Sequence, residues 1–297
     1  MTWSKAIKLI CVIPSCLIIS CSDDNTNTPS DDLYLNIPDA NFEAKLISLG
    51  IDSDNTVNKQ MLKTDAKNIQ DLNVDNLDIN DLTGIEGFVD LKKLSAAQNS
   101  ITQIDLKYNK LLDTLILFAN NIKSIDLSNN PELLKVNIES NELTTLMGMS
   151  NTTKLKRLDA SFNYLKEFSI NHEAIEVLYI SDNDLESFDV EGAVNLKNIF
   201  LKTNKLTSID VSSNTLLETL VLSDNKIKEL NLEQNSALTV LWISSNLLTG
   251  LDVSNLNALS FLSVYNNPDL SCIKIYSGQD VPNLTISDSQ ELNVLCD

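Results

Sequence analysis

The chain has very little histidine, a residue that many enzymes use for chemistry. Its 297 residues include one histidine, His172, and no cluster of histidine and cysteine side chains. Serine and aspartate are common, but Ser-His-Asp chemistry would require His172 to meet an oriented partner that no motif marks. We therefore expect a protein that is not an enzyme, with no catalytic residues, no metal ion and no cofactor.

Basic residues are also scarce. The chain has 22 Lys and Arg against 41 Asp and Glu, a formal net charge of −19. Binding to nucleic-acid phosphates relies on clustered Lys and Arg. We therefore expect no nucleic-acid partner, and the acidic residues indicate a soluble, self-repelling surface.

A long hydrophobic run is lacking at the N-terminus, where residues 9–19 form an apolar stretch too short to span a bilayer. It follows two lysines, which is typical of a secretory signal. The sequence Ile18-Ile19-Ser20-Cys21 resembles the lipobox of bacterial lipoproteins. That resemblance implies a signal peptide over residues 1–20 and membrane attachment through a lipid on Cys21.

The residues after Cys21 are polar and acidic, and residues 21–34 are too poor in apolar side chains to fold alone. We interpret them as a disordered tether. Ser22-Asp23-Asp24-Asn25 resembles an export tag that sends some lipoproteins to the outer face of the outer membrane. This predicts a lipid-anchored protein of the outer membrane that faces the cell exterior.

The strongest signal in the chain is an asparagine that returns every 20 to 22 residues. We call this set the asparagine ladder: Asn99, Asn120, Asn141, Asn163, Asn183, Asn204, Asn225, Asn246 and Asn267. An apolar frame of the form LxxLxLxxNxLxxL surrounds each member. Such a fixed period indicates a repeat array, because one unit of about 21 residues cannot bury its own leucines.

This frame resembles the leucine-rich repeat family over residues 69–270. The resemblance implies a right-handed solenoid with a parallel β-sheet on its concave side. The alternation in LxL sends the leucines inward and the intervening residues outward. We expect the asparagine amides to bridge the bend after each strand, where backbone groups would otherwise lack partners.

The other half of each unit carries a second alternating apolar pair, such as Ile104 and Leu106. Only about 11 residues separate each asparagine from the first leucine of the next unit, which leaves little room for a helix and its connections. The sequence therefore predicts an extended or irregular convex side.

Residues 35–68 are predicted to form an N-terminal cap with a short helix, in which Phe42, Leu46 and Ile47 share a face and Asp39 is the N-cap. Residues 36–42 resemble the cap of internalin-like bacterial surface proteins. Some such caps carry a calcium loop, but Thr56 and Val57 depart from its pattern. We therefore interpret the segment as an ordinary acidic loop.

At the other end, residues 271–297 lose the repeat frame and contain Cys272 and Cys296. Two cysteines that bracket a terminal segment suit a disulfide-closed cap, which would stabilise the fold by around 3 kcal/mol in the chain-entropy model. Two free thiols are the alternative, which a cytosolic location would favour.

Side chains on the displayed face of the sheet differ between units. The residue inside each LxL forms one column, in which four successive units contribute Tyr179, Phe200, Val221 and Trp242. Phe261 and Tyr265 flank this column. Exposed aromatic and aliphatic groups in one patch are typical of interaction sites, although strand positions favour such residues for propensity alone.

We therefore predict a lipid-anchored surface protein that mediates protein–protein recognition or adhesion through its concave face. Carbohydrate capture for nutrient uptake is a second hypothesis, because aromatic rings stack on sugar faces while Asn, Asp and Ser bond hydroxyl groups. A structural, self-associating spacer of the envelope is a third.

Overall fold

The structure is a computed structural model that describes residues 33–296. The predicted signal peptide, the lipidation site at Cys21 and nearly all of the tether lie outside these residues. None of the helices in the described part has both the length and the apolar character needed to cross a membrane.

The N-terminal cap consists of strand β1 (Tyr34–Asn36), helix α1 (Ala40–Ser48) and strand β2 (Gln60–Leu62), with β1 and β2 paired antiparallel. Asp39 caps α1, because its carboxylate accepts hydrogen bonds from the backbone amides of Asn41 and Phe42. Phe42 and Leu46 are fully buried. The predicted helix is therefore present, and its apolar face closes the first end of the core.

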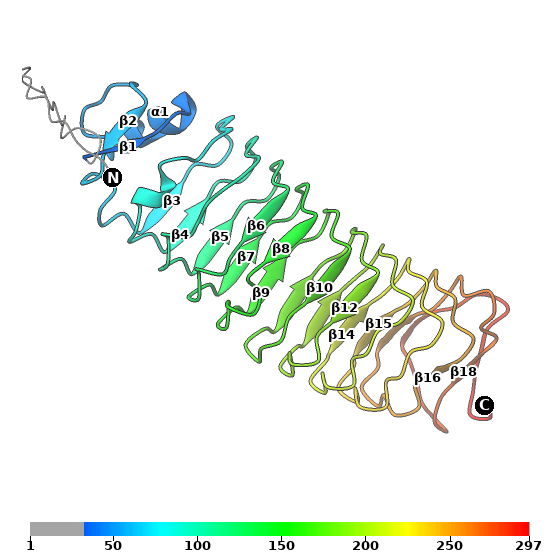
Figure 1. Ribbon diagram of the computed structural model, residues 1–297. Coiled ribbons are helices and arrows are strands. Elements are labelled where there is room, and N and C mark those ends of the chain that lie inside the picture. The colour runs from blue at the N-terminus through cyan, green and yellow to red at the C-terminus, as the bar shows by residue number, and fades with distance from the viewer. Residues whose placement is uncertain (1–32, 297) are drawn as a thin grey trace, which may run out of the picture. The chain divides into compact units, whose positions relative to one another are not determined.

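Beyond the cap, the chain winds as a parallel β-solenoid of about eleven turns (Figure 1). One strand from each turn joins an eleven-stranded sheet, which we call the main sheet. Its strands are β3 (Asp71–Asn73), β4 (Lys93–Ser95), β5 (Thr114–Ile116), β7 (Lys135–Asn137), β9 (Arg157–Asp159), β11 (Val177–Tyr179), β13 (Asn198–Phe200), β14 (Thr219–Val221), β15 (Val240–Trp242), β17 (Phe261–Ser263) and β19 (Asn283–Thr285).

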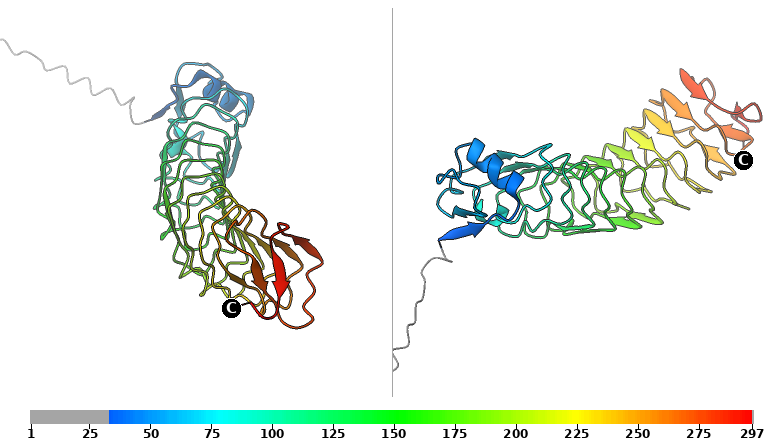
Figure 2. Two further views of the ribbon diagram at one scale, coloured as in Figure 1. Left: turned by 90° about the vertical axis from the view of Figure 1, so that its right-hand side faces the viewer. Right: turned by 90° about the horizontal axis from the view of Figure 1, so that it is seen from above.

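The opposite side of the solenoid is irregular, as the sequence predicts. It carries three small parallel sheets, formed by β6 (Ser124–Asp126) with β8 (Thr145–Met147), by β10 (Glu167–Ser169) with β12 (Ser187–Asp189), and by β16 (Leu251–Asp252), β18 (Cys272–Lys274) and β20 (Glu291–Asn293). Turns make up most of the rest, with one short 3₁₀ helix at Ile85–Gly87. Figure 2 shows the turns following one another from the cap to the C-terminal coil.

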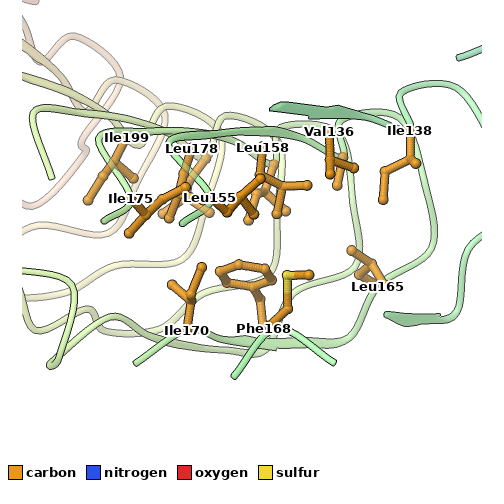
Figure 3. Packing of buried hydrophobic residues seen from close by; sticks show 14 of the residues in the cluster. Val136, Ile138, Leu155, Leu158, Leu165, Phe168, Ile170, Ile175, Leu178 and Ile199 are labelled. Atoms are coloured by element: carbon orange, nitrogen blue, oxygen red, sulfur yellow. The ribbon is translucent and has the colours of Figure 1, made fainter. Parts of the chain in front are cut away.

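The hydrophobic core runs between these two sides. Figure 3 shows Val136, Leu158 and Leu178 pointing from the main sheet toward Phe168 and Ile170 on the other side. The central residue of the main-sheet strands is buried from β3 to β17, while its two neighbours in each strand face outward. Each turn thus buries its apolar side chains against the turns before and after it.

The asparagine ladder behaves as predicted. Asn204 is typical: its amide nitrogen donates to the carbonyl of Ile180 in the preceding turn at 3.0 Å and to the carbonyl of Leu201 in its own turn at 3.2 Å. Its amide oxygen accepts from the backbone amide of Leu185 at 3.0 Å. Eight of the nine are buried and Asn99 is half-buried. One side chain therefore joins two turns at every bend.

A second set of buried asparagines escaped the sequence analysis. Asn109, Asn130, Asn214 and Asn235 are fully buried, and each amide donates to carbonyls of the preceding turn. All four lie ten residues after a member of the asparagine ladder. That spacing was the available signal, although the set is interrupted in the middle of the array. There the buried Thr152 donates to the carbonyl of Met149 in its own turn.

The C-terminal segment continues the solenoid although the repeat pattern fades there. Strand β19 pairs with β17 in the main sheet, and β20 pairs with β18 on the other side. Gln290 takes the role of a ladder asparagine, since its amide donates to the carbonyl of Val264. The predicted disulfide between Cys272 and Cys296 is present, with the two Cα atoms 5.8 Å apart.

The hydrogen bonds of the ladder predict that removal of one side-chain amide strongly lowers the free energy of unfolding. Replacing Asn204 by alanine leaves the Ile180 carbonyl and the Leu185 amide without this partner, so we expect a loss of about 2–4 kcal/mol in the free energy of unfolding. Urea denaturation measures the loss. Asn121→Ala is the matched control, because Asn121 is exposed and lies next to a ladder position. Equal stability of the two variants would contradict the proposed role of the ladder.

Candidate functional site

The single histidine does not form a catalytic arrangement. Both ring nitrogens of His172 are buried, and neither has a hydrogen-bond partner within residues 33–296. Burial lowers the pKa of its imidazole. Across the same residues, no group of three or more His, Cys, Asp or Glu side chains is arranged to hold a metal ion.

The acidic loop after α1 contains a buried carboxyl group. Asp52 is 1% exposed, and neither carboxylate oxygen has a partner among the described residues. Burial raises the pKa of Asp52, and the negative charge of Asp54 raises it further. The nearby Glu43 accepts hydrogen bonds from the backbone amides of residues 58–60. This loop is therefore held to the helix of the cap by a carboxylate on α1.

The outer face of the main sheet carries the residues that the sequence analysis selected. The parallel register aligns Tyr179 with Phe200, Phe200 with Val221, and Val221 with Trp242. The predicted column therefore exists. We call this whole face, from β3 to β19, the sheet surface.

Three side chains in the middle of the sheet surface form a stack. The rings of Tyr179 and Phe200 lie parallel, with centroids 4.4 Å apart. The guanidinium of Arg157 lies 4.3 Å from the centroid of Tyr179, a cation–π contact. We call these three residues the aromatic stack. Each member is half-buried, so its neighbours fix its orientation while one edge stays open to solvent.

Val221 differs from the other members of the column. It is 4% exposed, because it lies between the larger side chains of Phe200 and Trp242. A contact surface on this column would therefore include Val221 only at its margin.

Exposed aromatic surface gathers at the C-terminal end. Trp242, Phe261 and Tyr265 are 46%, 43% and 46% exposed. They border a depression of 380 Å³, which also includes the side chains of Ser244 and Ser263. We call this depression the aromatic hollow. The sequence identified its aromatic residues but gave no indication that they surround a recess.

The N-terminal half of the sheet surface is polar. Lys93 lies 3.5 Å from Asp71 across two strands, and both side chains are well exposed. Asp75 accepts hydrogen bonds from the hydroxyl of Ser95. Burial raises the pKa of Glu139, with the charge of Asp159 as a second cause. This half therefore offers both positive and negative charges, together with hydrogen-bonding side chains.

Comparison with solved structures identifies the architecture. A leucine-rich repeat protein of Leptospira interrogans superposes with a TM-score of 0.62 at 23% identity, covering 70% of this chain and 61% of that one. The leucine-rich repeat domain of APL1B gives a TM-score of 0.52 at 20% identity, covering 75% of this chain and 84% of that one. The chain is a leucine-rich repeat solenoid.

An internalin of Listeria monocytogenes also resembles this leucine-rich repeat chain, with 18% identity, a TM-score of 0.48, and coverage of 90% of this chain and 99% of the other. No family model matches the sequence, and no curated protein matches it. The leucine-rich repeat frame is therefore recognised here through its spacing and its fold.

The buried imidazole predicts a pH effect on stability. Since the folded state lowers the pKa of His172, the unfolded chain takes up the proton first as the pH falls below about 6.5. The free energy of unfolding should therefore decrease from pH 7.5 to pH 5.5. In His172→Leu this contribution is absent, so the stability of the variant relative to the unmodified chain should increase over the same interval. Urea midpoints measure the difference, and parallel pH profiles of the two proteins would contradict the assignment.

Proposed function

We propose that this leucine-rich repeat chain is a non-enzymatic recognition protein that binds another protein across its sheet surface. A lipid on Cys21 holds it at the outer face of the outer membrane, where it mediates recognition or adhesion. The aromatic stack, fixed in the middle of the sheet surface, is the observation that carries the proposal.

The size of the sheet surface suits a protein partner. Ten spacings between eleven strands, at about 4.8 Å each, give a length of roughly 48 Å. Each strand displays two outward residues, and these change from turn to turn while the inward residue stays aliphatic. A face of this length can contact a protein partner over many turns at once, as the extended binding surfaces of solenoids do.

The chemistry of the aromatic stack also suits a protein interface. Tyr, Trp and Arg are the residue types that most often dominate binding energy. Arg157 holds Tyr179, and Tyr179 stacks on Phe200, so little side-chain entropy remains to be lost on binding. The polar N-terminal half of the sheet surface then forms the solvated rim of the same footprint.

The N-terminal sequence supports the proposed attachment to the membrane. The run from Lys5 to Cys21 has the order of a lipoprotein signal, with basic residues, an apolar stretch and then the cysteine. Removal of residues 1–20 takes two lysines and no acidic residue, so the net charge becomes −21. The polar tether then keeps this acidic solenoid clear of the lipid surface.

The binding proposal predicts that truncation of the exposed rings removes the partner. Chains that carry Phe200→Ala or Trp242→Ala should capture at least 10-fold less partner protein from intact cells than the unmodified chain, as expected when residues worth about 2 kcal/mol are lost. Quantitative affinity capture is the measurement. Tyr164→Ala is the matched control, since Tyr164 is an exposed aromatic residue that follows a ladder asparagine outside the sheet surface. Undiminished capture by both folded variants would refute the proposal.

The anchoring proposal predicts that one cysteine carries the lipid. Cys21→Ser should abolish incorporation of a labelled fatty acid and release the chain from the membrane fraction. Cys16→Ser should leave both unchanged, because Cys16 lies in the segment that is removed. Antibody labelling of intact cells measures the exterior location. Label retained by Cys21→Ser, or no antibody access to the intact cell, would contradict this part of the proposal.

A further inference from the structure

The aromatic hollow is a separate chemical environment within the sheet surface. Its three rings come from consecutive turns: Trp242 from β15, and Phe261 and Tyr265 from β17 and the residues after it. Its volume of 380 Å³ lies within the range of about 300–1,000 Å³ that small-ligand sites occupy. The rings remain nearly half exposed, so they can still cover an apolar ligand face.

The floor of the aromatic hollow is polar. The hydroxyl oxygens of Ser244 and Ser263 lie 2.8 Å apart, and Ser244 is 2% exposed. With Ser244 as the donor between the two oxygens, the hydroxyl hydrogen of the half-buried Ser263 remains available to a ligand. Asn283 and Thr285 line the same recess from β19. An aliphatic or aromatic side chain of a peptide would bury these polar groups without partners, which is unfavourable.

The charges beside the aromatic hollow balance. The ammonium of Lys202 lies 3.8 Å from the carboxylate of Asp224, and both residues line the recess. The pair gives no net attraction for an ion of either sign. Asp224 nevertheless keeps an exposed carboxylate that accepts hydrogen bonds from neutral donors such as hydroxyl groups.

We propose that the aromatic hollow binds a neutral oligosaccharide. Pyranose rings combine an apolar face of C–H groups with a rim of hydroxyl groups, which matches aromatic walls around a hydroxyl-bearing floor. One sugar ring stacks on the indole of Trp242, its hydroxyls donate to Asp224, and further hydroxyls bond Ser263 and Asn283. This site goes beyond the proposed protein recognition, since it lies beside the aromatic stack and needs none of its members.

Trp242 provides a direct reporter. The chain contains two tryptophans, Trp3 and Trp242, so in the full chain with Trp3→Phe the emission comes from the hollow alone. The probes are neutral oligosaccharides built from glucose, galactose, mannose and N-acetylglucosamine. We expect a saturable change in Trp242 emission with at least one of them. Calorimetric titration of the unmodified chain should return the same affinity.

Two variants and a control define the contacts. Asp224→Asn should weaken that affinity about 10-fold by removing a charged acceptor, while Tyr265→Ala should weaken it by a similar factor through loss of one wall. Tyr179→Ala should bind the sugar normally, because Tyr179 belongs to the aromatic stack and does not line the hollow. Circular dichroism and melting temperature verify that each variant is folded.

The outcomes separate the two proposals. The oligosaccharide site is overturned if no neutral sugar changes the Trp242 emission. It is also overturned if only charged sugars or short aromatic peptides change it. Sugar binding that Asp224→Asn and Tyr265→Ala leave intact overturns it as well. Protein capture that Phe200→Ala removes tests the proposed function alone, whatever the sugar titration shows.

Discussion

The structure depends on the asparagine ladder, whose side chains join successive turns at nine bends. From β4 to β17, the chain leaves each main-sheet strand through a residue in the left-handed region, with φ between +54° and +59°. That conformation aims the following asparagine into the solenoid, where its amide satisfies backbone groups of two turns at once. Without it the bend would bury carbonyls and amides with no partners. The ladder therefore fixes the spacing of the turns.

Because the spacing of the turns is fixed, equivalent residues of successive repeats lie side by side on the main sheet. Residues about 21 positions apart become neighbours at roughly 4.8 Å, the distance between adjacent strands. Arg157, Tyr179 and Phe200 can stack only because the register aligns their strands. A slip of one residue would send these side chains inward and the leucines outward. The hydrogen bonds at the bends thus fix the strand register, and the register aligns the outward side chains on the sheet surface.

Features that recur in every repeat could be predicted from the sequence. Features that depend on side chains of the adjacent strands could not. The asparagine ladder, the helix after Asp39 and the outward column follow from local patterns, and the structure has all three. The burial of Val221 was not predictable from its own repeat, since it results from the size of Phe200 and Trp242 on either side.

The repeat pattern does not reveal the last turns, because glutamine takes the place of asparagine at their turn-bridging positions. Glutamine has a side chain longer by one methylene. Gln290 donates to the carbonyl of Val264 as a ladder asparagine would. Gln279 donates to the carbonyl of Val253 as a member of the second set would. The asparagine ladder ends at Asn267, although side-chain amides still donate to carbonyls of the preceding turn beyond it. The physical requirement at each bend is an amide within reach of the preceding turn, and the residue type is one solution to it.

The aromatic hollow follows from the same alignment. Ser263 succeeds Trp242 in one outward column, while Phe261 and Tyr265 lie on either side of Ser263 in the chain. A small side chain among three large ones leaves a space that their rings cannot fill, because the strand register holds each ring above its own turn. The recess therefore exists through the difference between neighbouring repeats. In a solenoid whose core positions are nearly uniform, such differences are where a specific ligand site arises.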